Sequence, residues 1–366
     1  MEWLQRIWSR IRVWFGNLIR QIRGIRVSPD VAIDLGTATV LVYVQGKGIV
    51  LTEPSVVAVE TDTGRIRYIG KNAQPMLDKP PRDLTAIRPL REGVIEQYGV
   101  TSKMIQYFIR RACGSMFFPP RVMICVPTGI TEVEERAVLD AAREAGARRT
   151  YLIEEPKAAA IGAGLDISGP DGRMVVDIGG GTTDIAVLCL GDVVTSGSIR
   201  VAGDKMDEAI KSYVRRRYDV LIGDQTAERI KQQIGCVIRP AERRTMEVRG
   251  NSTREHIPKQ IILSSDEMIE ALTEPVTAII TEIANVIERT PPELIGDILK
   301  NGIVMTGGGS LLTGLDELVT RFTGVRAHVA PDAVCCVVLG TGKMLDRLDT
   351  MTDGAINLSG MRKLRE

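Results

Sequence analysis

A short pattern of strand, acidic residue, glycine turn and strand occurs twice in this chain, and it constrains the fold more than any other feature. Residues 31–42 hold an apolar run that ends at Asp34, then the turn Gly36-Thr37, then a second apolar run. Residues 175–187 repeat this order around Asp177, with three glycines and two threonines in the turn. A duplicated fold explains the repeat most economically, and two similar halves that face each other would bring both turns to one cleft.

The composition is that of an average globular protein of about two domains. The chain has 366 residues, of which 44% are hydrophobic and 25% are charged, which argues against disorder, a fibre or a polytopic membrane protein. Its 47 basic and 46 acidic residues nearly balance, so we expect no nucleic-acid partner. Six cysteines without a C-x-x-C pair indicate buried thiols in a reducing compartment. Two histidines leave little material for a zinc site or a Ser-His-Asp triad.

The repeated turns have the residues that a phosphate group needs around it. Glycines let backbone N–H groups approach an anion, threonine hydroxyls add donors, and a carboxylate at the strand end suits hydrated Mg²⁺. A third glycine turn, Thr306–Ser310, follows an apolar run, so its backbone either approaches a flat ligand such as a nucleobase or is a plain strand-to-helix loop. Neither a P-loop nor a G-x-G-x-x-G motif is present, so a nucleotide would be held between the two hairpins.

The rest of the chain from about Val27 alternates short β-branched runs with helical patterns. This alternation predicts α/β architecture with a mixed sheet. The polar segment Pro240–Lys259 is interpreted as a surface loop or a hairpin. The predicted helices are Thr101–Cys113, Thr131–Ala145, Lys205–Tyr218, Thr226–Ile234, Asp266–Arg289 and Leu315–Arg321.

The first 27 residues differ sharply from the remainder. They contain all three tryptophans and, with six arginines and one glutamate, carry a net charge of +5. Their periodicity predicts an amphipathic helix that lies in the interface of an anionic membrane. Two alternatives are a helix that packs on its own domain or on a partner, and a mitochondrial transit peptide. The residues expected to face the membrane are Trp3, Leu4, Ile7, Trp8, Ile11, Trp14 and Phe15.

Three motifs together resemble the nucleotide motifs of the superfamily of actin, heat-shock chaperones and sugar kinases. Asp34-Leu-Gly-Thr is similar to its first phosphate motif, Asp177–Asp184 to its second, and Thr306–Ser310 to its adenosine motif. Within this superfamily, four further stretches resemble bacterial actins of the MreB/Mbl family. These stretches are Ile87–Ile95, Tyr151–Gly162, Ala202–Ile210 and Thr226–Gly235, and the whole resemblance extends from about Val31 to Leu345.

The resemblance implies a fold and a division into domains. The fold would be the actin-like ATPase fold, with two ribonuclease H-like α/β halves around a nucleotide cleft and the N-terminal amphipathic helix in addition. Residues 28–156 would form domain I, with a smaller insert at about 50–90, and residues 157–345 would form domain II, with a smaller insert at about 206–270. Residues 1–27 would be the membrane helix and residues 346–366 a C-terminal tail.

The resemblance also assigns roles to individual residues. ATP and Mg²⁺ are the implied ligands, with Asp34 and Asp177 holding the metal through water. Glu155, which precedes Pro156, and Thr182 would place the attacking water, because phosphoryl transfer needs positioning and charge neutralisation above all. Glu228 and Lys231 have an alternative interpretation as a surface ion pair. The implied nucleotide contacts are Asp34, Gly36, Thr37, Ala38, Thr39, Asp177, Gly179, Gly180, Gly181, Thr182, Glu228, Arg229, Lys231, Gly307, Gly308, Gly309 and Ser310.

A second membrane contact is implied by the loop that follows the first predicted helix. Phe117 and Phe118 lie between Gly114 and Pro119, where MreB proteins carry a hydrophobic insertion loop. Alternatively, the two rings pack in the core between a helix and the strand that begins at Val122.

The resemblance implies a cytoskeletal ATPase of slow turnover. It would polymerise with itself at the inner, cytoplasmic face of the membrane and organise cell-wall synthesis and rod shape with integral cell-elongation and wall-synthesis proteins. The alternatives are a sugar kinase, a chaperone ATPase, the cell-division actin homologue and a membrane scaffold that binds nucleotide without turnover. For the sugar kinase, the sequence has no evident hydroxyl-activating Asp, and for the chaperone the residues after Leu345 leave no room for a peptide-binding domain. For the cell-division homologue, the targeting helix lies C-terminal in the family and the extra subdomain has no evident counterpart here.

Overall fold

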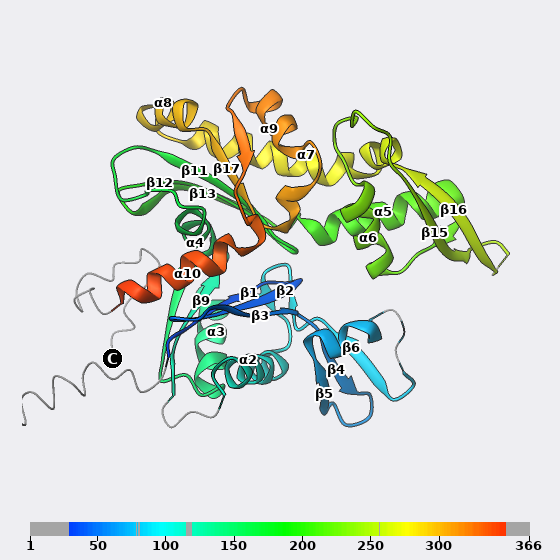
Figure 1. The fold of residues 1–366 in the computed structure, drawn as a ribbon, viewed down its shortest axis with the longest axis horizontal. Coiled ribbons are helices and arrows are strands. Elements are labelled where there is room, and N and C mark those ends of the chain that lie inside the picture. The colour runs from blue at the N-terminus through cyan, green and yellow to red at the C-terminus, as the bar shows by residue number, and fades with distance from the viewer. Residues whose placement is uncertain (1–28, 78, 80, 115–118, 256, 349–366) are drawn as a thin grey trace, which may run out of the picture.

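Two five-stranded sheets with the same topology form the framework of the molecule (Figure 1). The computed structural model describes residues 29–77, 79, 81–114, 119–255 and 257–348. The first sheet has the order β10-β9-β1-β2-β3, and the second has the order β18-β17-β11-β12-β13. In each sheet, three consecutive strands pair antiparallel, and two later strands pair parallel on the other side of the first one. The same arrangement in both sheets confirms the duplicated fold. The strands are β1 (Val31–Leu35), β2 (Thr39–Val44), β3 (Gly48–Pro54), β9 (Arg121–Val126), β10 (Arg149–Glu154), β11 (Arg173–Ile178), β12 (Thr183–Cys189), β13 (Asp192–Ile199), β17 (Ile303–Thr306) and β18 (Ala327–Val329).

The repeated motifs are the two hairpins that open each sheet. In the first, Leu35 pairs with Val40, so residues 36–39 form the turn. In the second, Ile178 pairs with Thr183, so residues 179–182 form the turn. The glycines at these positions leave room for a tight reversal, and Asp34 and Asp177 sit near the end of their strands.

Two helices, α4 (Glu155–Gly162) and α10 (Cys336–Arg347), lie between the two sheets. They share one apolar core with Ala32 of the first sheet and Val175 of the second. The helices cross at backbone contact: a Cβ added to Gly340 would lie 1.8 Å from the carbonyl oxygen of Ala158. Helix α10 follows the second sheet in the chain, yet it also packs on β1, β2 and β9 of the first.

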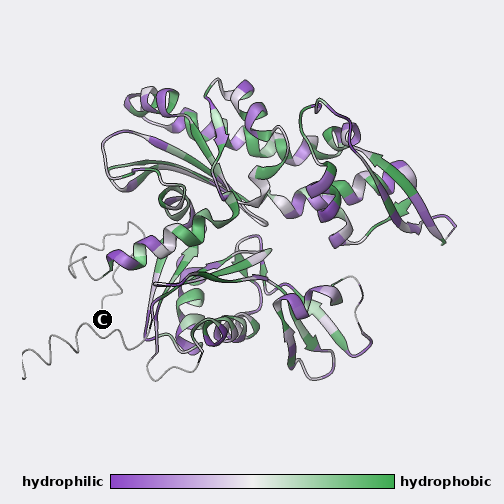
Figure 2. Cartoon of the chain, viewed as in Figure 1, coloured by the Kyte–Doolittle hydropathy of each residue, from purple (hydrophilic) through white to green (hydrophobic). Residues whose placement is uncertain are grey.

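Further helices cover the outer faces of the sheets. On the first sheet, α2 (Tyr98–Cys113) and α3 (Glu132–Glu144) bury Phe108 and Val138 against β1 and β9. Thr131 caps α3 through a reciprocal bond with Glu134, which fixes where that helix begins. The second sheet buries alternate side chains of β11 against α7 (Ser265–Arg289), α8 (Pro292–Asn301) and α9 (Leu315–Thr323). Figure 2 shows hydrophobic residues along both sheets and polar residues on the outer sides of the helices.

Each half carries a smaller subdomain at its outer edge. In domain I it is the sheet β5-β4-β6 of β4 (Val57–Glu60), β5 (Ile66–Ile69) and β6 (Leu84–Ile87), with the short helices η1 (Gly70–Asn72) and η2 (Gln74–Met76). In domain II it contains the sheet β14-β15-β16 and two helices. Their bounds are β14 (Val220–Leu221), β15 (Thr245–Ser252), β16 (Pro258–Ser264), α5 (Gly203–Tyr218) and α6 (Asp224–Ile234).

The six predicted helices are all present, with ends shifted by a few residues at most. The polar segment Pro240–Lys259 contains most of the hairpin of β15 and β16, so the hairpin interpretation is confirmed over its loop alternative. Three helices, α4, α8 and α10, were not predicted. The cysteines are all free, but only Cys125, Cys236 and Cys336 are buried, and the other three are half-buried.

Several predictions lie outside the described residues. The N-terminal helix over residues 1–27, the loop residues Phe117 and Phe118, and the tail after Leu348 all belong to this group. Among the described residues, no helix is long and apolar enough to cross a membrane.

Candidate functional site

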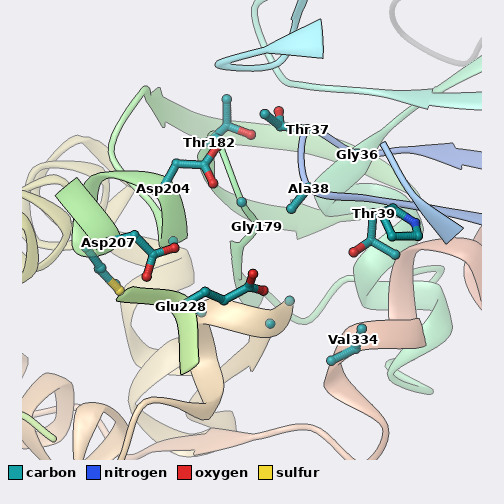
Figure 3. Close-up of a pocket in the computed structure, with 18 of the residues that line it drawn as sticks. Gly36, Thr37, Ala38, Thr39, Gly179, Thr182, Asp204, Asp207, Glu228 and Val334 are labelled. Carbon is teal, nitrogen blue, oxygen red and sulfur yellow. The ribbon is translucent and has the colours of Figure 1, made fainter. Parts of the chain in front are cut away.

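A cavity of about 470 Å³ lies between the two halves at the ends of both hairpins (Figure 3). Both turns line it, as do the third glycine turn, α6 and residues of both smaller subdomains. The structure therefore brings together, from separate parts of the chain, nearly all of the predicted site residues. Those that line the cavity are Asp34, Gly36, Thr37, Ala38, Thr39, Glu155, Asp177, Gly179, Gly180, Gly181, Thr182, Glu228, Lys231, Gly307, Gly308 and Gly309.

The two hairpin turns touch each other across the cleft. A Cβ added to Gly180 would lie 2.7 Å from the Cβ of Ala38, and one added to Gly181 would lie 2.6 Å from Oγ1 of Thr37. Glycine is therefore required here for close approach of the two domains. Residues of both turns thus line one cavity, an arrangement that suits a chain of phosphates.

Four carboxylates gather behind the turns, although only Asp177 and Asp184 are nearly inaccessible. Burial raises the pKa of Asp34 and of Asp177 from 3.8 to about 7. Burial, together with the charges of Asp184, Asp34 and Asp177, raises the pKa of Glu155 well above its usual range. Like charges that are enclosed together favour protonation, so this cluster of carboxylates has a strong tendency to bind protons or a cation.

The donor set fits a hydrated cation. Asp177 accepts a hydrogen bond of 2.7 Å from Oγ1 of Thr306, which fixes one of its oxygens, and both it and Asp34 line the cavity. Among the described residues, no group of three or more His, Cys, Asp or Glu side chains is arranged to hold a metal directly. Carboxylates near a metal without ligating it act through its bound waters, which is the mode in which Mg²⁺ is commonly held.

The third glycine turn connects β17 to the short helix η3 (Gly308–Leu311). Gly307 has φ +79° and packs against the backbone of Ile178, the last residue of β11. The third glycine turn is therefore in contact with the strand end that leads into the second hairpin turn. Nothing lies within 4 Å of the position of a Cβ on Gly308, which faces the open cavity. Ser310, a predicted nucleotide contact, is buried and does not line the cavity. Its hydroxyl donates to the carbonyl of Gly307 and so stabilises the turn.

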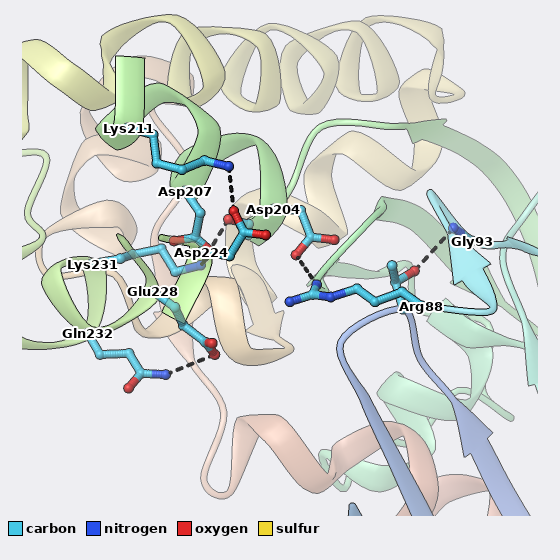
Figure 4. A network of polar contacts seen from close by, with 11 residues as sticks. Arg88, Gly93, Asp204, Asp207, Lys211, Asp224, Glu228, Lys231 and Gln232 are labelled. Atoms are coloured by element: carbon cyan, nitrogen blue, oxygen red, sulfur yellow. Dashed lines mark hydrogen bonds and ion pairs between the residues drawn. The ribbon is translucent and has the colours of Figure 1, made fainter. Parts of the chain in front are cut away.

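Helix α6 forms another wall of the cavity (Figure 4). Lys231 donates to Asp207 at 2.8 Å and to the carbonyl of Gly203 at 2.9 Å, which joins α6 to the start of α5. Glu228 accepts a hydrogen bond from Gln232 of its own helix, and within the described part of the chain Lys231 pairs with Asp207 rather than with Glu228. Arg229 is on the exposed face of α6 and does not line the cavity.

Contacts across the cleft tie the two halves together. Arg88 of domain I donates to Asp204 at the start of α5, at 3.1 Å. Nε2 of Gln225 on α6 donates to the carbonyl of Gln74 on η2, at 2.8 Å, and so joins the two smaller subdomains. Glu92, at the tip of the hairpin of β7 (Leu90–Arg91) and β8 (Val94–Ile95), lies within ion-pair distance of Lys205.

Sequence reasoning missed several residues that line the cavity. Asp204, Met206 and Asp207 lie within a stretch that resembles the family, but the resemblance assigned them no role. Arg88 and Gly93 lie in another such stretch. Leu312, Val334 and Val337 come from apolar runs without any polar signal, so only the folded arrangement reveals them.

Comparison with known proteins agrees with this geometry. The family model described as "MreB/Mbl protein" matches residues 28–353. The chain belongs to the MreB/Mbl family. It is 49% identical over 338 residues to the cell shape-determining protein MreB of Escherichia coli (strain K12), covering 91% of this chain and 97% of that protein. It is 48% identical to the cell shape-determining protein Mbl of Bacillus subtilis (strain 168), covering 88% and 97%.

Solved structures of the MreB/Mbl family have the same fold. MreB5 of Spiroplasma citri bound to ADP has a TM-score of 0.85 and 36% identity, covering 89% of this chain and 99% of that one. The same protein bound to AMPPNP has a TM-score of 0.84. The MamK double helical filament, at 22% identity and a TM-score of 0.75, shares the fold. The predicted actin-like architecture of two similar halves around a cleft is thereby confirmed.

Proposed function

We propose that this chain binds ATP with Mg²⁺ between its two halves and hydrolyses it slowly. The observation that carries the proposal is the contact of the two glycine turns, with Asp34, Glu155 and Asp177 gathered behind them. The structures of the Spiroplasma citri relative with ADP and AMPPNP support the same ligand class. GTP is the second candidate, because the third turn, with glycine at positions 307–309, offers a base only backbone groups.

The chain's own groups divide the work of holding the triphosphate. The backbone N–H groups of residues 36–39 and 180–182 would bind phosphate oxygens, with Thr37 and Thr182 as added donors, while the N–H of Gly179 donates to the carbonyl of Thr182 within the turn. The third turn and α6, through Gly307–Gly309, Glu228 and Lys231, would hold the adenosine. Asp34 and Asp177 would hold Mg²⁺ through its waters, and the ion when bound would neutralise the charge of the β- and γ-phosphates.

Glu155 would act as the base that orients the attacking water. It begins α4 beside the phosphate turns, and its raised pKa makes it an effective proton acceptor once a cation offsets the neighbouring carboxylates. Thr182 would place the same water from the opposite hairpin, since its residue lines the cavity next to Gly181. Both residues would position the water, which is the main requirement of phosphoryl transfer, and Glu155 would also accept its proton.

The test of hydrolysis is phosphate release from purified protein under saturating ATP and Mg²⁺. Glu155→Gln removes the base and keeps the volume, so we expect turnover to fall about 100-fold or more, with ATP affinity retained. Glu154→Gln is the matched control, since that neighbour does not line the cavity. Binding of ATP without any turnover by the wild-type protein would instead support the nucleotide-binding scaffold.

We further propose that the chain polymerises with itself and attaches its filaments to an anionic membrane, at the cytoplasmic face, where it organises wall synthesis and cell shape. The cell shape-determining names of its relatives support the last step. The membrane step rests on the tryptophan- and arginine-rich residues 1–27, and on Phe117 and Phe118 as a second contact.

One sedimentation assay tests this second proposal. Wild-type protein and a variant lacking residues 1–27 are spun with anionic liposomes and ATP, and the pellets are inspected by electron microscopy. We expect filaments on liposomes for the wild type and strongly reduced membrane binding for the shortened variant. Protein that stays in the supernatant as monomer under all conditions would contradict both filament formation and membrane attachment.

A further inference from the structure

Asp207 is a carboxylate of the cavity wall to which the function proposed above gives no role. It lies in the second turn of α5, and its side chain is 14% exposed. Its Oδ2 pairs with Nζ of Lys231 on α6 at 2.8 Å, whereas its Oδ1 is buried with no hydrogen-bond partner in the described part of the chain. Native folds leave few buried polar atoms unpaired, so this oxygen calls for a partner that the chain does not supply.

The surroundings of Asp207 indicate what kind of group that partner is. An ionised carboxylate only accepts hydrogen bonds, so the partner is a donor. Burial raises the pKa of Asp207 from 3.8 to about 6, with Lys231 opposing this effect and the charges of Glu228 and Asp204 adding to it. A phosphate oxygen beside these three carboxylates would be repelled. A neutral hydroxyl group donates a hydrogen bond without adding negative charge, and it therefore fits this position.

The place of Asp207 in the cavity points to the sugar of a nucleotide. Lys231 also donates to the carbonyl of Gly203, and a Cβ added to Gly203 would lie 3.2 Å from the carbonyl oxygen of Gly179. The pair of Asp207 and Lys231 is therefore next to the second phosphate turn. On the other side, Figure 3 shows Asp207 on the same wall as Glu228, which is proposed to hold the adenosine. The ribose joins the phosphates of a nucleotide to its base, so it would lie opposite Asp207.

We propose that Asp207 accepts a hydrogen bond from a ribose hydroxyl of the bound nucleotide and thereby selects ribonucleotides over deoxyribonucleotides. This inference rests on the proposed nucleotide-binding function. Lys231 would hold one carboxylate oxygen, and because the terminal torsion of an aspartate is broad, the carboxylate can turn its other oxygen toward the sugar. Acidic side chains recognise ribose in this way in dinucleotide-binding folds. A site built around such a bond rejects an analogue without the hydroxyl, since the buried acceptor then stays unpaired.

The first test compares three ligands on the full-length wild-type protein. The Kd values of ATP, 2′-deoxyATP and 3′-deoxyATP are measured by equilibrium titration at one concentration of Mg²⁺. Base, phosphates and metal are the same in all three, so any difference in Kd comes from the ribose. We expect the loss of one of the two hydroxyls to raise the Kd about 10-fold or more, the effect of a lost hydrogen bond to a charged group.

The second test removes the acceptor. In Asp207→Asn the single carbonyl oxygen would stay on Lys231 and an amide N–H would face the sugar. We expect its Kd for ATP to rise about 10-fold, its Kd for the disfavoured deoxy analogue to change little, and the preference between them to fall to about twofold or less. Asp207→Glu keeps the charge that pairs with Lys231 but displaces the oxygens by one methylene. Its preference should also fall, and it replaces the Asn variant if that variant unfolds.

Asp224→Asn is the matched control. Asp224 forms the other ion pair between α5 and α6, with Lys211, but it does not line the cavity (Figure 4). Its loss weakens the same helix contact by the same kind of interaction, so this variant should keep the preference for ribose that the wild type has.

Two outcomes would overturn the inference. One is a wild-type protein that binds all three nucleotides with Kd values within about twofold. The other is an equal loss of affinity for all three in the Asp207 variants, because the residue would then act only on the packing of α5 against α6. A wild-type protein that binds none of the nucleotides would defeat the proposed function itself, and this result is visible before any variant is made.

Discussion

At the scale of single residues, the carboxylates behind the turns make the stability of the nucleotide-free protein depend on pH. The pKa of Asp34 and of Asp177 is about 7 in the fold against an ordinary 3.8, so the folded state binds more protons than the unfolded state between these values. Their contribution to the free energy of unfolding is thus present near pH 4 and lost as the pH rises to about 7.

We therefore expect Asp177→Asn to raise the melting temperature relative to wild type, more at pH 7.5 than at pH 5, without nucleotide and with a chelator present. Thermal unfolding of both proteins across this range measures the difference. Saturating Mg²⁺ and ATP should remove the advantage, because a bound cation favours the ionised carboxylate. An equal difference in melting temperature between the variant and the wild type at both pH values would contradict the raised pKa of Asp177.

The open space in front of Gly308 leads to a second residue-level prediction. A side chain at this position would enter the cavity without touching the protein, since nothing lies within 4 Å of the Cβ position. Gly308→Val should weaken ATP binding by about tenfold or more and leave the melting temperature of the free protein nearly unchanged. Equilibrium titration with ATP measures the affinity. Unaltered binding would mean that the base lies in another part of the cavity.

At the scale of elements, the crossing of α4 and α10 depends on glycine. The Cβ of an alanine at 340 would overlap the carbonyl of Ala158, so Gly340→Ala should destabilise the fold by about 1–3 kcal/mol or more. Gly296→Ala in α8 is the control, because its Cβ meets open space and alanine there should stabilise the helix by up to about 1 kcal/mol. Urea unfolding measures both, and a stabilised Gly340→Ala variant would rule out the tight crossing.

The elements also show what the sequence could and could not predict. Amphipathic helices such as α5 and α7 were predicted because one face of each is apolar and the other polar. The strands were predicted from short β-branched runs punctuated by glycine, and the central ones are buried on both faces. Helix α4 lies between the two sheets and is rich in alanine and glycine, so it has little such contrast, whereas α10 has a contrast similar to that of α5 and was missed. The phosphate turns were predictable from glycine and threonine, whereas the interdomain partners Arg88 and Asp204 belong to separate segments that only the fold brings together.

At the scale of the whole molecule, the polar contacts that cross the cleft should control how fast nucleotide leaves. The pair of Arg88 and Asp204 is about one-third exposed on each side, and such pairs contribute up to about 1 kcal/mol. Arg88→Ala should therefore speed the release of a fluorescent ATP analogue up to about fivefold. Arg143→Ala, which breaks an exposed pair within α3, is the control.

Stopped-flow measurement of release separates the possibilities. Unchanged release from Arg88→Ala, or an equal effect of the control, would mean that closure depends on other contacts, such as that of Gln225 with Gln74.

The placement of α10 has a consequence for how the chain is made. Asp346 accepts a hydrogen bond from Gln45, a residue 301 positions earlier, and the helix covers a face of the first sheet. A ribosome therefore delivers the strands of domain I long before the helix that shields them. Until α10 has been synthesised, the apolar face of the first sheet that it covers stays exposed to solvent. We therefore expect chaperones to bind the nascent chain during synthesis.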